Sequence, residues 1–242
     1  MLKNPTIIFI IGACVLYVIY SVLRFWYYYE ISQNLILKAS GEHYEIAGGS
    51  DVRSVAVIGD STAVGVGTKS VSETYHYQFF ERHKDRFTFN VKNYGVSGAR
   101  VMDFAGQLAG VSSVDLIIIT ITGNDVTHGT SLKSIEEDLK TALLEAHKKA
   151  KQVILLTPGD LGEVRIVPLP LRLYWGTQSP RMSEVAHRVA QDTKTPHVDI
   201  YALHVPYFRD EPKKYYASDY FHPSADGYRV WADALDDAVK IE

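Results

Sequence analysis

The sequence predicts an α/β domain built on a parallel sheet. Short apolar, β-branched segments bounded by turn residues alternate with helix-like segments of ten to twenty residues, and strands that are buried on both faces of a parallel sheet have this character. The chain has 242 residues, 46% of them hydrophobic and 22% charged, which is ordinary for one globular domain with an appendage. Strands separated by helices indicate βαβ units with right-handed crossovers.

The appendage is predicted at the N-terminus. Residues Thr6–Leu23 carry no charge, and as a helix they would span about 27 Å, close to the hydrocarbon thickness of a bilayer. Arg24 and the aromatic cluster 25–29 follow, and such residues lie at the headgroup level. The alternative is a buried core helix. We predict that residues 1–29 are a membrane anchor with a transmembrane helix, which crosses the bilayer through residues 6–23.

Bulky aromatic residues occupy the position after the apolar run where a signal-peptide cleavage site needs small residues. Residues Ile11 to Cys14 resemble a bacterial lipoprotein box, with Cys14 as the lipidated residue, but the sequence stays apolar as far as Leu23. The better prediction is an uncleaved signal anchor, a single-pass membrane protein whose large domain lies outside the cytoplasm.

A polar segment, residues 30–50, is predicted to be a tether, and the domain is predicted to span residues 51–242. The apolar segment 161–180 shows no period and is predicted to be a loop over the sheet, which either shapes an acyl pocket, contacts the membrane or packs on its own domain. The predicted strands are 53–58, 88–94, 113–122, 152–157 and 196–201, and the predicted helices are 71–86, 101–108, about twenty residues after Ser131, 181–190 and 225–239.

Composition and motifs exclude several classes of function. A net charge of −3 gives no basic footprint, so no nucleic-acid partner is expected. Cys14 is the single cysteine, which excludes an internal disulfide and a cysteine-built zinc site. The stretch 59–67 is rich in glycine but lacks the ending of a P-loop and the spacing of a dinucleotide fingerprint. The Gly-x-Ser-x-Gly elbow of α/β-hydrolases is also absent.

Three predicted strands end in small polar clusters, and a fourth cluster precedes the last helix. In a parallel sheet these strand ends meet at one edge, where open α/β sheets bind ligands. A hydroxyl, a glycine turn, an amide and a carboxylate three residues from an imidazole are the parts that acyl transfer requires. Ser61 is therefore predicted to be a nucleophile. The clusters are Gly59-Asp60-Ser61, Gly95-Val-Ser-Gly98, Gly123-Asn124-Asp125 and Ser218-Asp-Tyr-Phe-His-Pro-Ser224.

These four clusters, in this order over residues 54–231, resemble the blocks of the SGNH hydrolase superfamily, also called the GDSL-like esterases and lipases. The leucine that often follows the first block is missing, since Thr62 stands there. The resemblance implies a flavodoxin-like, doubly wound, parallel five-stranded sheet in three α/β/α layers. It also implies a serine esterase that cleaves carboxylic esters of lipids or acylated carbohydrates through a covalent acyl-enzyme and needs no metal or other cofactor. A small-molecule ester would be its substrate.

Carried over to this sequence, the resemblance implies that Ser61 is the nucleophile, that His222 is its general base and later acid, and that Asp219 orients His222. The oxyanion donors would be the N–H of Ser61, the N–H of Gly98 and the side chain of Asn124. Gly95 remains an alternative to Gly98. The simpler interpretation of Asn124 is a residue that forms a turn. For the pair Asp219 and His222, the simpler interpretation is an aspartate that caps a helix and a histidine on the surface.

Two further polar residues adjoin these clusters. Asp60 is expected to support the turn rather than to act as an acid, because consecutive side chains point in different directions. His128 either lines the pocket or is solvated. Two other functions use the same residues or the same fold: an acyltransferase with an alcohol acceptor, and a non-catalytic binding module.

Overall fold

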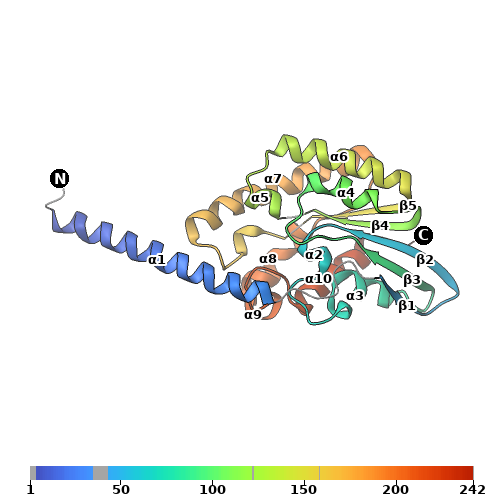
Figure 1. Ribbon diagram of the computed structural model, residues 1–242, viewed down its shortest axis with the longest axis horizontal. Coiled ribbons are helices and arrows are strands. Elements are labelled where there is room, and N and C mark those ends of the chain that lie inside the picture. Colours follow the sequence, from blue (N-terminus) through green and yellow to red (C-terminus); the bar gives the residue numbers. More distant parts are fainter. Residues whose placement is uncertain (1–3, 35–42, 122, 158, 242) are drawn as a thin grey trace.

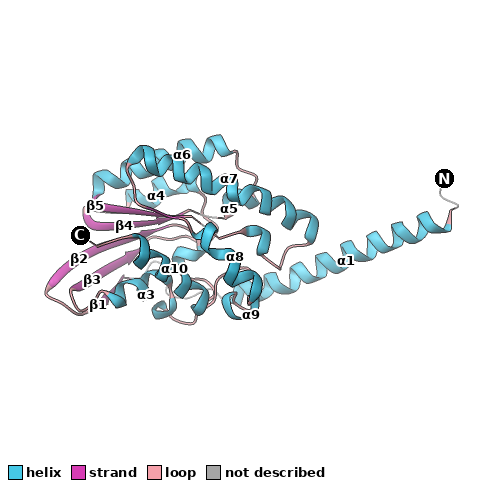
Figure 2. Ribbon diagram, turned by 180° about the vertical axis from the view of Figure 1, so that it is seen from behind, coloured by secondary structure: helices cyan, strands magenta, loops and turns pink. Residues whose placement is uncertain are grey.

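Six strands form one sheet in the order β1-β3-β2-β4-β5-β6 (Figures 1 and 2). The computed structural model describes residues 4–34, 43–121, 123–157 and 159–241, so the middle of the predicted tether and the predicted strand end at Thr122 lie outside the described residues. All neighbouring strands run parallel except β1, which is antiparallel to β3. The strands are β1 (His43–Ile46), β2 (Asp51–Ile58), β3 (Phe87–Asn93), β4 (Val114–Thr120), β5 (Ala150–Leu156) and β6 (His197–Val198).

Counted from β2, the five parallel strands follow the order 2-1-3-4-5 of a flavodoxin-like doubly wound sheet. The predicted fold class is confirmed. The order reverses between β2 and β4, and ligands of such sheets bind outside the carboxyl ends of the strands at this switch point. Both strands are buried on both faces, as expected for their continuous apolar runs 55–58 and 116–119.

Helices cover both faces of the sheet (Figure 1). On one face lie α3 (Tyr75–Arg82), α8 (Ile200–Asp210) and α10 (Ala225–Ala238), and on the other lie α4 (Phe104–Ala109), α6 (Leu132–Lys149) and α7 (Leu169–Thr193). The shorter helices are α2 (Ser61–Val64), α5 (Asn124–Thr127), α9 (Pro212–Tyr215) and the 3₁₀ turns η1 (Val71–Glu73), η2 (Val101–Asp103) and η3 (Leu161–Glu163).

The sheet begins earlier than predicted. β1 lies inside the segment 30–50 that was interpreted as a tether, so the prediction of five strands was one short and the sheet starts before residue 51. Four residues are too few to show a period, and an edge strand needs only one partner. The strand predicted at 196–201 is also shorter, because Asp199 caps α8 and the chain is helical from Ile200.

One helix prediction and one loop prediction were wrong. The helix predicted at 71–86 is divided at Thr74, whose extended backbone caps α3. The loop predicted at 161–180 is largely the first half of α7, a helix of 25 residues that continues through Pro180. Prolines at its start and middle hide the helix, because a proline is tolerated at the first turn but removes a hydrogen bond inside.

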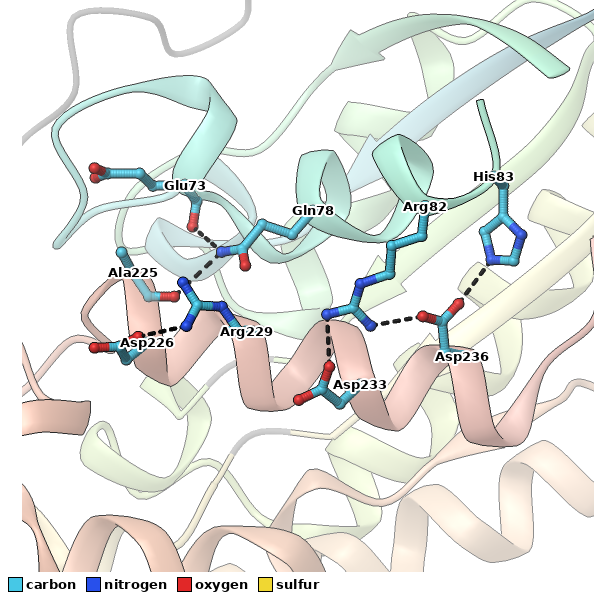
Figure 3. Close-up of polar contacts among 9 residues, drawn as sticks. All are labelled: Glu73, Gln78, Arg82, His83, Ala225, Asp226, Arg229, Asp233 and Asp236. Atoms are coloured by element: carbon cyan, nitrogen blue, oxygen red, sulfur yellow. Dashed lines mark hydrogen bonds and ion pairs between the residues drawn. The ribbon is translucent and has the colours of Figure 1, made fainter. Parts of the chain in front are cut away.

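Ion pairs fix α10 against α3 (Figure 3). The guanidinium of Arg82 donates to Asp233 at 2.5 Å and to Asp236 at 2.6 Å, and His83 Nε2 lies 2.7 Å from the other oxygen of Asp236. At the opposite end, the amide of Gln78 donates to the carbonyl of Ala225, the first residue of α10. The ion pairs thus hold the second half of α10 on α3, and the Gln78 contact holds the start of α10, next to the loop before it.

A long helix, α1 (Pro5–Asn34), projects from the domain (Figures 1 and 2). Residues 5–31 are long and apolar enough to cross a membrane, a property that a signal sequence shares. Near the domain, the Tyr28 ring packs edge-on against Tyr220 with 5.5 Å between centroids, and Tyr17 Oη accepts from the N–H of Leu169 at 3.3 Å.

His76 lies on α3 and is buried against β1 and α2. Its Nε2 lies 3.0 Å from the carbonyl oxygen of Ala63 and must donate to it, so Nδ1 accepts from the Tyr44 hydroxyl at 2.6 Å. Thr74 Oγ1, 3.1 Å from the same Nδ1, donates its hydrogen to Val71 instead. The neutral ring fits these partners, and burial lowers the pKa of His76 to about 4.

The low pKa of His76 predicts a loss of stability in acid. The unfolded chain binds this proton with a pKa of about 6.5, so the stability present above pH 6.5 falls as the pH drops towards 4. Between pH 7 and pH 5 we expect a loss of about 2 kcal/mol from this group. The free energy of unfolding is measured by urea denaturation at both pH values for the wild type and for His76→Gln, whose amide can still donate to Ala63. If both proteins lost the same free energy of unfolding between pH 7 and pH 5, the loss would not come from His76.

Candidate active site

Ser61 is the first residue of α2 and is separated from the end of β2 by Gly59 and Asp60. Asp60 caps this short helix, and its Oδ1 accepts from the N–H of Thr62 at 2.8 Å and from its hydroxyl at 2.7 Å. Gly59 has φ +150° and a Cβ there would lie 2.9 Å from the Thr120 carbonyl oxygen. The Gln107 amide donates to and accepts from the backbone of Gly59, both at 2.9 Å. The turn that presents Ser61 is thus held from both sides.

The carbonyl of Ala63 ties α2 to its neighbours. It accepts from His76 Nε2 at 3.0 Å and from Asn93 Nδ2 at 2.7 Å. Asn93 Oδ1 in turn accepts from the N–H of Gly95 at 2.9 Å. Ser61 therefore belongs to a rigid polar network, and the N–H of Gly95 is already engaged.

His222 and Asp219 come from the loop before α10 and meet Ser61 at the edge of the sheet. His222 Nε2 lies 3.0 Å from Ser61 Oγ, and His222 Nδ1 lies 2.6 Å from Asp219 Oδ2. Asp219 is fully buried, and its Oδ1 accepts from the N–H of Phe221 at 2.9 Å and of His222 at 3.0 Å. Because a carboxylate only accepts, Nδ1 carries the proton and Nε2 is free to accept from the serine.

Gly67 allows the segment after α2 to approach the loop that carries His222. It has φ +101°, and a Cβ there would lie 2.3 Å from the Pro223 carbonyl oxygen and 3.1 Å from His222 Cβ. The hydroxyl of Tyr228 on α10 donates to the neighbouring Val66 carbonyl at 2.8 Å. A side chain at position 67 would push the His222 loop away from Ser61.

Gly98 and Asn124 line the same cavity as Ser61. Gly98 has φ +83° and no atom within 4 Å of where a Cβ would be, and no hydrogen bond within the described residues engages its N–H. A Cβ on Gly95 would instead lie 3.0 Å from Ala63 Cβ. Of the two candidate glycines, the structure brings Gly98 to the cavity and packs Gly95 behind it.

Both hydrogens of the Asn124 side-chain amide are in use. Asn124 Nδ2 donates to Asp60 Oδ2 at 3.1 Å and to the Ala99 carbonyl at 3.0 Å. Burial raises the pKa of Asp60, and hydrogen bonds from Thr62 oppose this. Asp60 thus supports the site from behind, since it holds both the helix after Ser61 and the amide of Asn124.

The cavity beside Ser61 and His222 has a volume of about 420 Å³. Its wall is mostly apolar, with Ile166, Trp175 and Phe221 from the domain and Phe25 and Tyr29 from α1. His128 lies on the wall, where its Nδ1 donates to the Asn124 carbonyl at 2.8 Å. Among the residues whose side chains the structure describes, no group of three or more His, Cys, Asp or Glu is arranged to hold a metal ion.

Several residues that shape this site belong to no motif and were not predicted. Gln107 and His76 are polar residues on helices, and both are buried. A polar residue on the apolar stripe of a short helix was the available signal for each. Phe25 and Tyr29 lie on the predicted anchor, and nothing in the sequence indicates that they reach the domain.

A model of the GDSL-like lipase/acylhydrolase family matches residues 57–230. A GDSL-like esterase of Mycobacterium tuberculosis is 27% identical over 187 residues, which cover 74% of this chain and 59% of that protein, so the chain spans less than two thirds of its relative.

Two solved structures share the fold. The acetylxylan esterase Axe2 of Geobacillus stearothermophilus is 23% identical with a TM-score of 0.58, over 81% of this chain and 96% of that one. An extracellular lipase of Streptomyces rimosus is 18% identical with a TM-score of 0.59, over 77% and 100%. The family model spans every residue of the Ser61–His222 site and most of the sheet, and the chain belongs to the GDSL-like lipase/acylhydrolase family.

Proposed function

We propose that this protein is a serine hydrolase that cleaves carboxylic esters through a covalent acyl-enzyme. The observation that carries the proposal is the pair of contacts at His222, 3.0 Å to Ser61 Oγ and 2.6 Å to Asp219. Nucleophile and base lie within hydrogen-bond reach, and the base is oriented by a third group, which is the arrangement that activates a serine. The names of the relatives (an esterase, an acetylxylan esterase and a lipase) support ester hydrolysis and differ in substrate.

In the acylation half-reaction, His222 Nε2 takes the proton of Ser61 as Oγ forms a bond to the ester carbonyl carbon. The carbonyl π electrons move onto the oxygen. Asp219 accepts from Nδ1–H and stabilises the imidazolium. The C–O bond to the alcohol then breaks, and the alcohol leaves with the proton that His222 returns.

In the deacylation half-reaction, His222 Nε2 deprotonates a water molecule, which attacks the carbonyl carbon of the acyl-enzyme. The bond between this carbon and Ser61 Oγ then breaks, the acid leaves, and His222 returns the proton to Ser61.

The oxyanion of each tetrahedral intermediate would accept hydrogen bonds from the N–H groups of Ser61 and Gly98 and from Asn124. The first N–H groups of a helix lack intrahelical acceptors, and Ser61 is the first residue of α2. For Asn124 to take part, its side chain turns so that the hydrogen now donated to Ala99 points to the oxyanion.

We further propose that α1 is an uncleaved, single-pass membrane anchor with the hydrolase domain outside the cytoplasm. Its length and apolar composition support a membrane span. The contacts of Tyr28 with Tyr220 and of Tyr17 with Leu169 support its retention, because a cleaved signal sequence makes no lasting contact with the domain.

Replacing the nucleophile tests the reaction. Ser61→Ala removes the attacking oxygen, and we expect hydrolysis of 4-nitrophenyl acetate to fall at least about 10³-fold, with loss of labelling by a fluorophosphonate probe. Ser72→Ala, which changes an exposed serine outside the site, is the matched control. A wild type that neither hydrolyses the ester nor binds the probe would refute the proposal.

The roles of Asp60 and Asn124 can be separated by a double-mutant cycle. Asn124→Ala removes the oxyanion donor, and kcat should fall about 10²- to 10³-fold with KM little changed. Asp60→Asn presents a second amide donor to Asn124 Nδ2 and should lower kcat by turning that side chain. Because both changes act through one amide, the double variant should be no slower than the slower single variant. If the two reductions in kcat instead multiplied in the double variant, the two residues would act independently and the coupling would be contradicted.

Retention of α1 can be read from the mass of the mature protein. A chain tagged at its C-terminus and extracted from membranes should retain the residues before Cys14, and Cys14→Ser should change neither processing nor membrane association. A lipoprotein would instead begin at a lipid-modified Cys14, and Cys14→Ser would block its maturation.

A further inference from the structure

We propose that α1 forms a wall of the active-site cavity and that the substrate is an ester of a long hydrocarbon chain, which enters from the bilayer beside α1. The inference rests on the proposed ester hydrolysis and names the substrate class of that site. It assigns Phe25 and Tyr29, residues of the anchor, a role in substrate selection.

The first observation is that the anchor reaches the site. Phe25 and Tyr29 are four residues apart, so they lie on one face of α1, and their rings stack with 6.1 Å between centroids. Both line the cavity that holds Ser61 and His222. Tyr28 packs against Tyr220, two residues before His222. Without α1, this cavity would lose part of its apolar wall.

The second observation is a second apolar cavity of about 480 Å³ that lies between α1 and the start of α7. Phe25 lines both cavities, so the two adjoin at this side chain. A hydrocarbon chain that passes Phe25 would thus stay in contact with apolar side chains. The second cavity is lined by Tyr17, Val18, Ser21, Val22, Phe25 and Trp26 of α1 and by Pro168, Pro170 and Leu171.

The third observation is the exposed apolar start of α7. Leu169 is 51% exposed and Leu173 65% exposed, and this end of α7 extends on the side of the domain where α1 leaves it (Figures 1 and 2). Leucines exposed to water in such a group mark a contact surface. Because α1 would stand in the bilayer here, a lipid surface is the partner that fits. It also explains why the segment 161–180 lacks an amphipathic period.

The charges along α1 place the two cavities relative to the bilayer. The uncharged run of α1 ends at Arg24, whose guanidinium lies 5.6 Å from the Tyr28 ring, an interfacial pair that marks the headgroup level. The α1 residues that line the second cavity lie mainly before Arg24, whereas the α1 residues that line the cavity with Ser61 lie after it. A lipid ester can therefore keep its chain in the apolar layer while its carbonyl reaches Ser61. A soluble acylated sugar would use neither apolar wall.

The test compares chain lengths with the full chain in phospholipid nanodiscs. For the wild type, kcat/KM for 4-nitrophenyl esters should rise from acetate to decanoate, by up to about fourfold per added CH₂. Phe25→Ala and Tyr29→Ala should lower the decanoate-to-acetate ratio at least tenfold. Phe25→Trp, which narrows the passage, should lower it as well. Tyr27→Ala is the matched control, since Tyr27 is 65% exposed and lines neither cavity.

Fluorophosphonate labelling of Ser61 in each variant shows whether the site has remained folded. A wild type that prefers acetate, or ratios that Phe25 and Tyr29 variants leave unchanged while Ser61 is still labelled, would overturn this inference and leave ester hydrolysis intact. A wild type that cleaves no ester and takes no label would instead refute the proposed function.

Discussion

The hydrogen bond between Ser61 Oγ and His222 Nε2 is the contact on which the rest of the site depends. It joins segments 161 residues apart, and neither segment can move far without breaking it. β2 and α2 fix the serine, and the hydrogen bonds of Gln78 with Ala225 and of Tyr228 with Val66 fix the start of α10 next to the loop that carries the histidine. Gly67 lets the two backbones approach, because any side chain there would meet Pro223. The fold thus holds Ser61 and His222, which are far apart in the sequence, in a rigid contact.

Behind this contact lies a layer of buried polar groups that are satisfied by one another. Asp60 caps α2 and holds Asn124, while Asn93 and His76 share the Ala63 carbonyl. A buried carboxylate or imidazole without partners would be costly, so each of these groups constrains its neighbours. Positions that do not touch substrate can therefore control the geometry of those that do.

The fold and the polar clusters could be predicted from the sequence because both leave local signals. Buried strands such as 116–119 are continuous apolar runs rich in β-branched residues. Gly59, Ser61 and Asn124 follow the ends of such strands. The start of α7 could not be predicted, since its apolar positions follow no period against water and its prolines resemble loop signals. β1 is too short to show alternation. Contacts between α1 and the domain leave no mark in either segment.

The most direct test of the account is to find where an acyl group becomes attached. The protein is mixed with a slowly hydrolysed ester, quenched in acid during turnover and digested, and the modified peptide is sequenced by mass spectrometry. The account predicts one acyl adduct, on the hydroxyl of Ser61, that does not accumulate once His222 is replaced by alanine. An adduct on another residue, or turnover without any covalent intermediate, would contradict it.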